Sequence, residues 1–203
     1  MDAWLLQQFS SQVAVASPIS ANNPRKPKLA LSDLPTGFRE VPRPINSLIR
    51  GAIASTMQNH FSSNAIQIGD LTTYMNLDQW TLIIGFITPL DNQEAVHIFD
   101  LGLEQPAALE TFATGIKKSN HFLGSVNIVE KKVVPALSNQ VGQSSTGMTI
   151  TANAKQISLF SEMVAFRRNN FGAMLIIGRL HDRIPATTTF KLAQKFDSNL
   201  LNF

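Results

Sequence analysis

The residues with the greatest chemical potential are two adjacent arginines, Arg167 and Arg168, at the end of a predicted β-hairpin. Neighbouring side chains of a strand point to opposite faces of a sheet, so the two guanidinium groups should diverge. We expect one arginine to pair with Glu162 or with a helix C-terminus while the other reaches solvent. That structural role is the first expectation, and a contact between Arg167 and an anion or a partner is the alternative.

Catalytic chemistry finds little support in the residue types. The chain has no cysteine, which excludes disulfides, thiolate nucleophiles and cysteine-based zinc sites. Residues 142–147 place hydroxyls between two glycines but lack the Gly-x-Ser-x-Gly spacing of a nucleophile elbow, so a turn leading into a strand explains them. We therefore expect no enzyme activity, no catalytic residue, no metal and no cofactor. Four histidines show no pairing at helical spacing: His60, His97, His121 and His181.

Positive charge is concentrated near the N-terminus. Residues 1–50 contain six basic and three acidic residues, which accounts for the whole net charge of +3. A nucleic-acid-binding protein more often spreads its basic residues over a folded face, so no nucleic acid is expected as a partner. A basic arm can instead remain solvated, or contact anionic lipid or an acidic protein.

Residues 1–32 form a predicted N-terminal arm and linker. Residues 1–15 have the pattern of a short amphipathic helix, and residues 17–28 have the proline-rich composition of a linker. The helix either packs on its own domain or docks on a membrane or partner, and both alternatives stay open. Deletion of residues 1–30 is expected to leave the domain folded and to weaken association. The candidate partner contacts are Trp4, Phe9, Arg25, Lys26, Lys28, Arg167 and Arg168.

A folded domain is predicted over residues 33–203. Apolar residues at intervals of three and four from Ile45 to Met57 predict a helix that starts after Pro44 and has one buried face. Two strands are predicted around Asp78, and Trp80 at the start of the second is expected to belong to the core. The other predicted elements are a helical region at 91–119 split by Pro106, strands at 122–134, 144–152, 157–166 and 171–177, and a helix at 187–201.

The last two predicted strands form a hairpin. The pair Asn169 and Asn170 tolerates the positive φ that a two-residue turn demands. The four late strands are joined by short turns, which requires antiparallel pairing. Strands in a run with helices around them predict an α+β fold, an α/β/α sandwich with a central, mainly antiparallel sheet.

Three segments carry a resemblance to a known family: Leu34-Pro-Thr-Gly-Phe-Arg-Glu40, Met163-Val-Ala-Phe-Arg-Arg-Asn-Asn-Phe-Gly-Ala173 and Leu192-Ala-Gln-Lys-Phe-Asp-Ser198. Together with the order of elements, they resemble the PsbP-like proteins, the fold family of an extrinsic photosystem II protein. The resemblance covers roughly residues 33–200 and is closest to cyanobacterial-type members. It implies a protein that binds or helps to assemble larger complexes without a cofactor or catalysis.

The expected function is therefore non-catalytic binding or assembly with a protein partner, associated with photosynthetic membrane complexes. The alternative is a small-ligand or lipid carrier with a pocket between sheet and helices. No apolar run reaches the roughly 18 residues that span a bilayer, and the N-terminus lacks the basic region of a secretory signal. The expected location is the cytoplasm or the surface of the thylakoid membrane, and the lumen only if a presequence was removed.

Overall fold

The structure is a computed structural model that describes residues 28–60, 69–104, 126–133, 140–154, 157–180 and 188–201. Within these ranges the chain forms helices and strands in the α+β order that the sequence predicts. In chain order they are η1 (Leu31–Asp33), β1 (Arg39–Glu40), α2 (Arg43–His60), β2 (Leu71–Asn76), β3 (Thr81–Pro89), α3 (Gln93–Glu104), β4 (Val126–Val133), β5 (Ser144–Ala154), β6 (Ile157–Arg168), β7 (Phe171–Leu180) and α5 (Thr189–Leu201).

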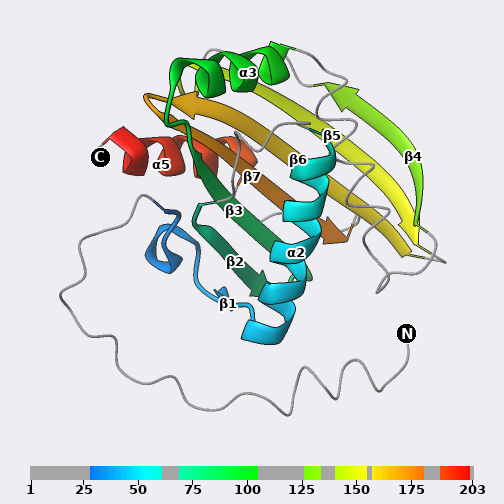
Figure 1. Ribbon diagram of the computed structural model, residues 1–203. Helices are drawn as coiled ribbons and strands as arrows, with labels where there is room; N and C mark the ends of the chain where they lie inside the picture. The colour runs from blue at the N-terminus through cyan, green and yellow to red at the C-terminus, as the bar shows by residue number, and fades with distance from the viewer. Residues whose placement is uncertain are drawn as a thin grey trace.

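The described strands build one seven-stranded sheet in the order β1-β2-β3-β7-β6-β5-β4 (Figure 1). Every pair of neighbours in this sheet is antiparallel. The four late strands follow one another across one half of the sheet, so their predicted antiparallel pairing is confirmed. The last of them, β7, then pairs along the whole of β3 and joins the two halves of the chain at the centre of the sheet.

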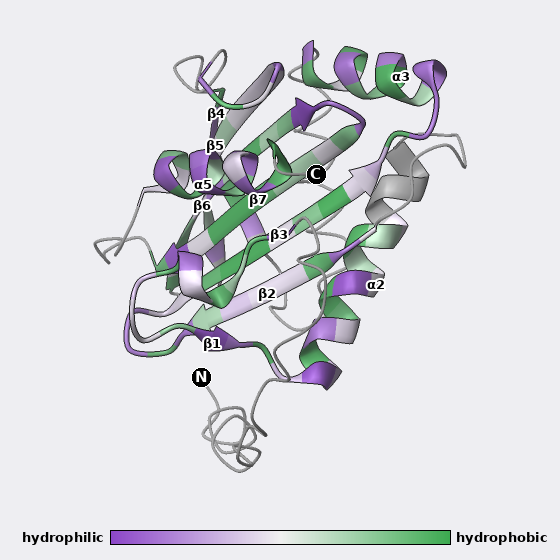
Figure 2. Cartoon of the chain, turned by 90° about the vertical axis from the view of Figure 1, so that its left-hand side faces the viewer, coloured by the Kyte–Doolittle hydropathy of each residue, from purple (hydrophilic) through white to green (hydrophobic). Residues whose placement is uncertain are grey.

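Helices cover both faces of this sheet, with α2 and α3 on one face and α5 on the other (Figures 1 and 2). On the first face Ile53 and Phe99 pack against alternate residues of the central strands. On the second face Phe196 lies at the centre of a separate apolar cluster and meets Phe166 edge to face, with ring centroids 5.8 Å apart. Each large apolar side chain buried in this way contributes roughly 1.5–3 kcal/mol.

The β6–β7 hairpin has the predicted two-residue turn. Asn169 adopts the left-handed conformation with φ of 52°, and Arg168 pairs with Phe171 across the strands. Both strands are longer than predicted, since β6 continues through the two arginines before the chain turns and β7 continues to Leu180. Asparagine tolerates this φ better than most residues, which is why the turn could be predicted from the local sequence.

The remaining predicted elements agree in kind, with shifts at their ends. The first helix begins at Arg43, two residues before the predicted start at Ile45, and the helical region predicted from residue 91 begins at Gln93. The half of that region beyond Pro106 lies outside the described residues. The two strands around Asp78 are confirmed as β2 and β3.

The predicted place of Trp80 in the core is wrong. Its side chain is 38% exposed, and the residue belongs to the β2–β3 turn with φ of 48°. The expectation failed because aromatic residues beside an apolar strand are usually buried, whereas the strand itself begins one residue later, at Thr81. Periodicity along the chain does not mark where a turn stops and a strand starts.

The boundary predicted after residue 32 also needs correction. Leu29 is completely buried in the cluster under α5, and its carbonyl accepts a hydrogen bond from the Tyr74 hydroxyl at 2.8 Å. Asn199 of α5 donates to the carbonyl of Lys28. Residues 28–32 therefore pack on the domain, and a deletion of residues 1–30 would remove a core side chain instead of leaving the domain intact.

The ionisation of Tyr74 should report this contact directly. Burial, and to a lesser extent the charges of Glu40 and Asp33, raise the pKa of Tyr74 to about 12. The folded protein holds the phenolic proton more tightly than the unfolded chain does. This contribution to stability is therefore complete below about pH 10 and is lost as the pH rises towards 12.

Tyr74 is the single tyrosine in the sequence, so ultraviolet titration of tyrosinate reads it alone. We expect a midpoint near pH 12 in the full chain and in a variant lacking residues 1–27. A variant lacking residues 1–30 loses the Leu29 acceptor and should show a lower midpoint and a lower stability. A midpoint near 10 in the full chain, as for an exposed tyrosine, would show that the hydroxyl is not buried.

Candidate functional site

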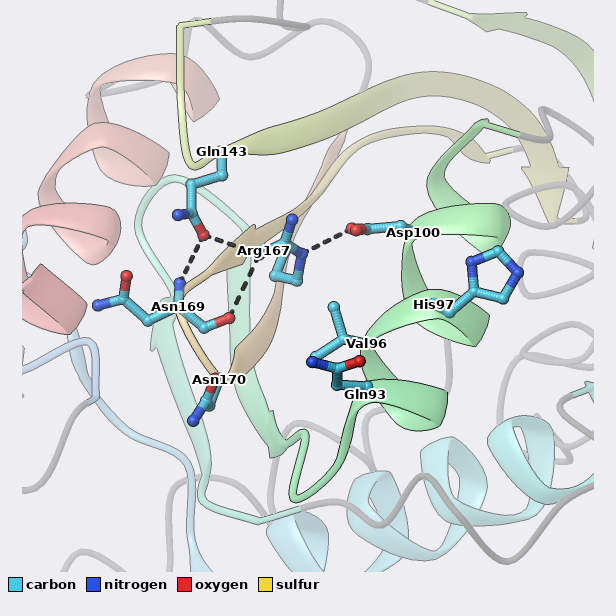
Figure 3. Close-up of a pocket in the computed structure, with 8 residues that line it drawn as sticks. All are labelled: Gln93, Val96, His97, Asp100, Gln143, Arg167, Asn169 and Asn170. Atoms are coloured by element: carbon cyan, nitrogen blue, oxygen red, sulfur yellow. Dashed lines mark hydrogen bonds and ion pairs between the residues drawn. The ribbon is translucent and has the colours of Figure 1, made fainter.

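A shallow, open depression of about 530 Å³ lies at the turn end of the β6–β7 hairpin (Figure 3). It is bounded by α3 on one side and by the turn and the segment that leads into β5 on the other. All of its lining residues except Val96 are of polar types, and half of them carry a carboxamide. The lining residues are Gln93, Val96, His97, Asp100, Gln143, Arg167, Asn169 and Asn170.

Arg167 is held rigidly at this depression. Its Nε donates to Asp100 Oδ1 at 2.7 Å, and its Nη1 donates to Gln143 Oε1 at 2.8 Å and to the Asn169 carbonyl at 3.4 Å (Figure 3). Among the described residues, none accepts a hydrogen bond from Nη2. Because these bonds already hold the Arg167 side chain in one position, binding of a ligand to Nη2 would cost little further side-chain conformational entropy.

Asp100 anchors Arg167 from α3 and also accepts a hydrogen bond from Ser144 Oγ at 2.7 Å. Partial burial is the largest single influence and raises the pKa of Asp100. The hydrogen bonds from Arg167 and Ser144, with the charges of Arg167 and His97, outweigh it and lower the pKa overall. These contacts leave Asp100 as the shared acceptor that holds both Arg167 and Ser144 in place.

The segment before β5 is hydrogen-bonded to the hairpin end that borders the depression. Gly142 has φ of 71°, and the next residue, Gln143, donates its backbone N–H to the Arg167 carbonyl at 2.7 Å. The side-chain oxygen of Gln143 also accepts the backbone N–H of Asn169 at 2.8 Å. The prediction that residues 142–147 form a turn entering a strand is confirmed, since β5 begins at Ser144.

Arg168 points to the opposite face and pairs with Asp197 of α5. Its Nε and Nη2 donate to the two carboxylate oxygens at 2.7 Å and 2.5 Å, and this pairing raises the pKa of Arg168. The predicted divergence of the two arginines is confirmed. The expectation that one reaches solvent and the other pairs with Glu162 or a helix C-terminus is wrong, because α3 and α5 each present a carboxylate at the hairpin end. Glu162 instead accepts the hydroxyl of Thr189 at 2.8 Å.

The other candidate contacts are not brought to the depression. Lys28 is exposed and does not line it. Trp4, Phe9, Arg25 and Lys26 lie outside the described residues.

Sequence reasoning missed the residues that α3 contributes. Gln93, His97 and Asp100 are separated by four and three positions, so they share one face of α3. That spacing was a usable signal for a polar helix face. Their convergence with Arg167 was not visible, because the hairpin lies 67 residues further along the chain from Asp100.

Metal and membrane features are limited in the part of the chain that is described. There, no cluster of three or more histidine, aspartate or glutamate side chains is arranged to bind a metal ion. No helix in the same ranges combines the length and the apolar character needed to cross a bilayer. The expectations of no metal and no cofactor stay predictions.

No protein-family model matches the chain, and no curated protein sequence matches it significantly. The class that the fold and the site define is an α+β protein with an antiparallel sheet and a polar depression at one end of it. The resemblance to the PsbP-like proteins stays a proposal.

Proposed function

We propose that this protein is a non-catalytic binding or assembly protein that holds an acidic segment of a protein partner at the depression around Arg167. One observation carries the proposal. The guanidinium is fixed by Asp100 and Gln143, while no described residue accepts from its Nη2 group, which lies beside an open surface lined by polar residues. Arginine prefers carboxylates because its planar donors match the two oxygens.

The carboxamides around Arg167 suit a polypeptide ligand. Gln93, Asn169 and Asn170 each offer a donor and an acceptor, which complement the N–H and C=O groups of an extended chain. The charge of Asp100 offsets that of Arg167, so long-range attraction is weak. Selectivity then comes from directed hydrogen bonds, and we expect moderate affinity.

The wider setting of this function is also a proposal. A central antiparallel sheet with helices on both faces is the arrangement that a PsbP-like sandwich requires, and it supports a role in assembling photosynthetic membrane complexes. Such a protein would work in the cytoplasm or at the thylakoid surface, with peripheral membrane contact. A lipid carrier has less support, because the described parts of the spaces between sheet and helices are filled by buried apolar side chains.

A charge series at Asn170 tests the proposal without disturbing the ion pair. Asn170 is exposed, and its backbone carbonyl, which accepts the Leu90 N–H at 2.8 Å, survives substitution. A partner is first recovered with tagged full-length protein from separated soluble and membrane fractions, identified by mass spectrometry and purified. Titration calorimetry at low salt should then show that Asn170→Asp binds the partner about tenfold more weakly, because the new carboxylate repels the acidic segment of the partner. Asn170→Lys should bind it more tightly.

Leu48 on α2 supplies the matched control. It is 52% exposed and does not line the depression. Leu48→Asp and Leu48→Lys change the charge by the same amounts and should leave the affinity unchanged. Equal effects at both positions would mean that net charge, and not this site, governs binding. Recovery of the protein alone from both fractions would contradict the binding function.

A further inference from the structure

Trp80 occupies an unfavourable backbone position. It is the last residue of the four-residue loop between Asn76 and Thr81, which pair across β2 and β3. Its φ of 48° lies in the left-handed region, where glycine and asparagine are common and a bulky aromatic residue is an outlier. Local conformational preference therefore does not explain why a tryptophan stands there.

The loop is nevertheless held by three hydrogen bonds. The Gln79 N–H donates to Asn76 Oδ1 at 3.0 Å, and the Thr81 hydroxyl donates to the Gln79 carbonyl at 3.2 Å. The Trp80 N–H donates to the Leu77 carbonyl at 3.3 Å. Asn76 itself is only 4% exposed, so the bond that holds Gln79 starts from a buried side chain. The strained conformation is imposed by a rigid frame, as is common at functional sites.

Two large apolar residues of this loop are partly exposed. Leu77 is 36% exposed and Trp80 is 38% exposed, with the exposed carboxylate of Asp78 between them in the sequence. Tryptophan is the residue type most often found at the energetic centre of protein interfaces. Two apolar side chains are too few for a flat interface of roughly 800 Å² per partner, so they suit insertion into a cleft.

We propose that the Leu77–Trp80 turn is a docking element that inserts into an apolar cleft with a basic rim on a folded protein partner. The cleft would take the indole and the leucine, and the rim would pair with Asp78. A carboxylate at the tip opposes insertion into a bilayer, which favours a protein over a lipid surface. This surface is independent of the depression, because β3 runs nine residues, roughly 30 Å, from Trp80 to the hairpin end.

The first variant is Trp80→Gly, which separates docking from folding. Glycine adopts the positive φ without strain, so the melting temperature should stay within about 4 °C of that of the wild-type protein. Binding to the purified partner, recovered with the full chain and identified, should fall at least tenfold. Leu77→Ala and Asp78→Lys should weaken binding too, whereas Leu48→Ala, at a leucine that is 52% exposed on α2, should not. A much larger fall in melting temperature for Trp80→Gly would show that the indole is a packing residue and would overturn the proposal.

Fluorescence provides the second measurement. The chain has two tryptophans, so a Trp4→Phe background leaves Trp80 as the reporter. Adding the purified partner should shift its emission to the blue and protect it from acrylamide. The same response with vesicles of phosphatidylcholine and phosphatidylglycerol, or the failure to find any partner that depends on Trp80, would overturn the proposal. A partner that docks through this turn alone should give the same response with Asn170→Asp, so failure here is distinguishable from failure of the function proposed for the depression.

Discussion

Replacement of Gly142 by alanine should lower the free energy of unfolding by about 3 kcal/mol. Gly142 has φ of 71°, which an L side chain rarely adopts, and a Cβ there would lie 2.5 Å from the Arg167 carbonyl oxygen. That carbonyl accepts the Gln143 N–H, so it cannot move away without loss of the hydrogen bond. The substitution should also loosen Gln143 and with it the fixed position of Arg167.

Urea denaturation of Gly142→Ala measures this loss, with Gly51→Ala as the matched control. A Cβ at Gly51 meets nothing within 4 Å, and the residue lies within α2. Alanine favours a helix over glycine by roughly 1 kcal/mol, so the control should be more stable than the wild-type protein. If both variants were stabilised, the close approach of residue 142 to the Arg167 carbonyl would be disproved.

Replacement of Asp197 by alanine is the second large effect, a loss of about 3 kcal/mol. The Asp197 side chain is 9% exposed and that of Arg168 is 20% exposed, so little water would take the place of the carboxylate. Asp197 Oδ2 also accepts the Gly142 N–H at 3.0 Å. The variant therefore leaves a guanidinium and a backbone donor without their acceptor at a mostly buried position.

Lys195 on the same helix is the control for Asp197. Its ammonium group lies 3.7 Å from Asp33, but its side chain is 54% exposed, so Lys195→Ala should cost less than about 1 kcal/mol. Asp197→Asn keeps one acceptor oxygen, so its loss of free energy of unfolding should lie between the losses of those two variants. Chemical denaturation of all three variants gives the order directly, and equal losses for Asp197→Ala and Lys195→Ala would contradict the importance of this ion pair.

These two variants act on one connected structure. Gly142 is hydrogen-bonded to Asp197 on the α5 face, while its neighbours Gln143 and Ser144 contact Arg167 and Asp100 on the α3 face. The segment before β5 is thus tied to the helices on both faces of the sheet. We expect the double variant Gly142→Ala/Asp197→Ala to lose less free energy of unfolding than the two single variants lose together, because each substitution disturbs the same contacts.

Much of the architecture follows from local sequence. Asn169 and Asn170 predict the turn because few other residues accept its φ, and adjacent positions in β6 must place Arg167 and Arg168 on opposite faces. The spacing of apolar residues predicts α2 and α5 because a helix repeats every 3.6 residues. Each of these properties depends on neighbours a few positions away.

The partners of those residues were decided by the tertiary structure. Asp100 lies 67 positions from Arg167 and Asp197 lies 29 positions from Arg168, so no local pattern links them. The burial of Leu29 likewise depends on Tyr74, 45 positions away, and the exposure of Trp80 depends on where β3 begins. Sequence periodicity determines which face of an element is apolar and which way a side chain points. Which other side chain it contacts depends on how the sheet brings distant elements together. The candidate site consists of such contacts between residues that are far apart in the sequence.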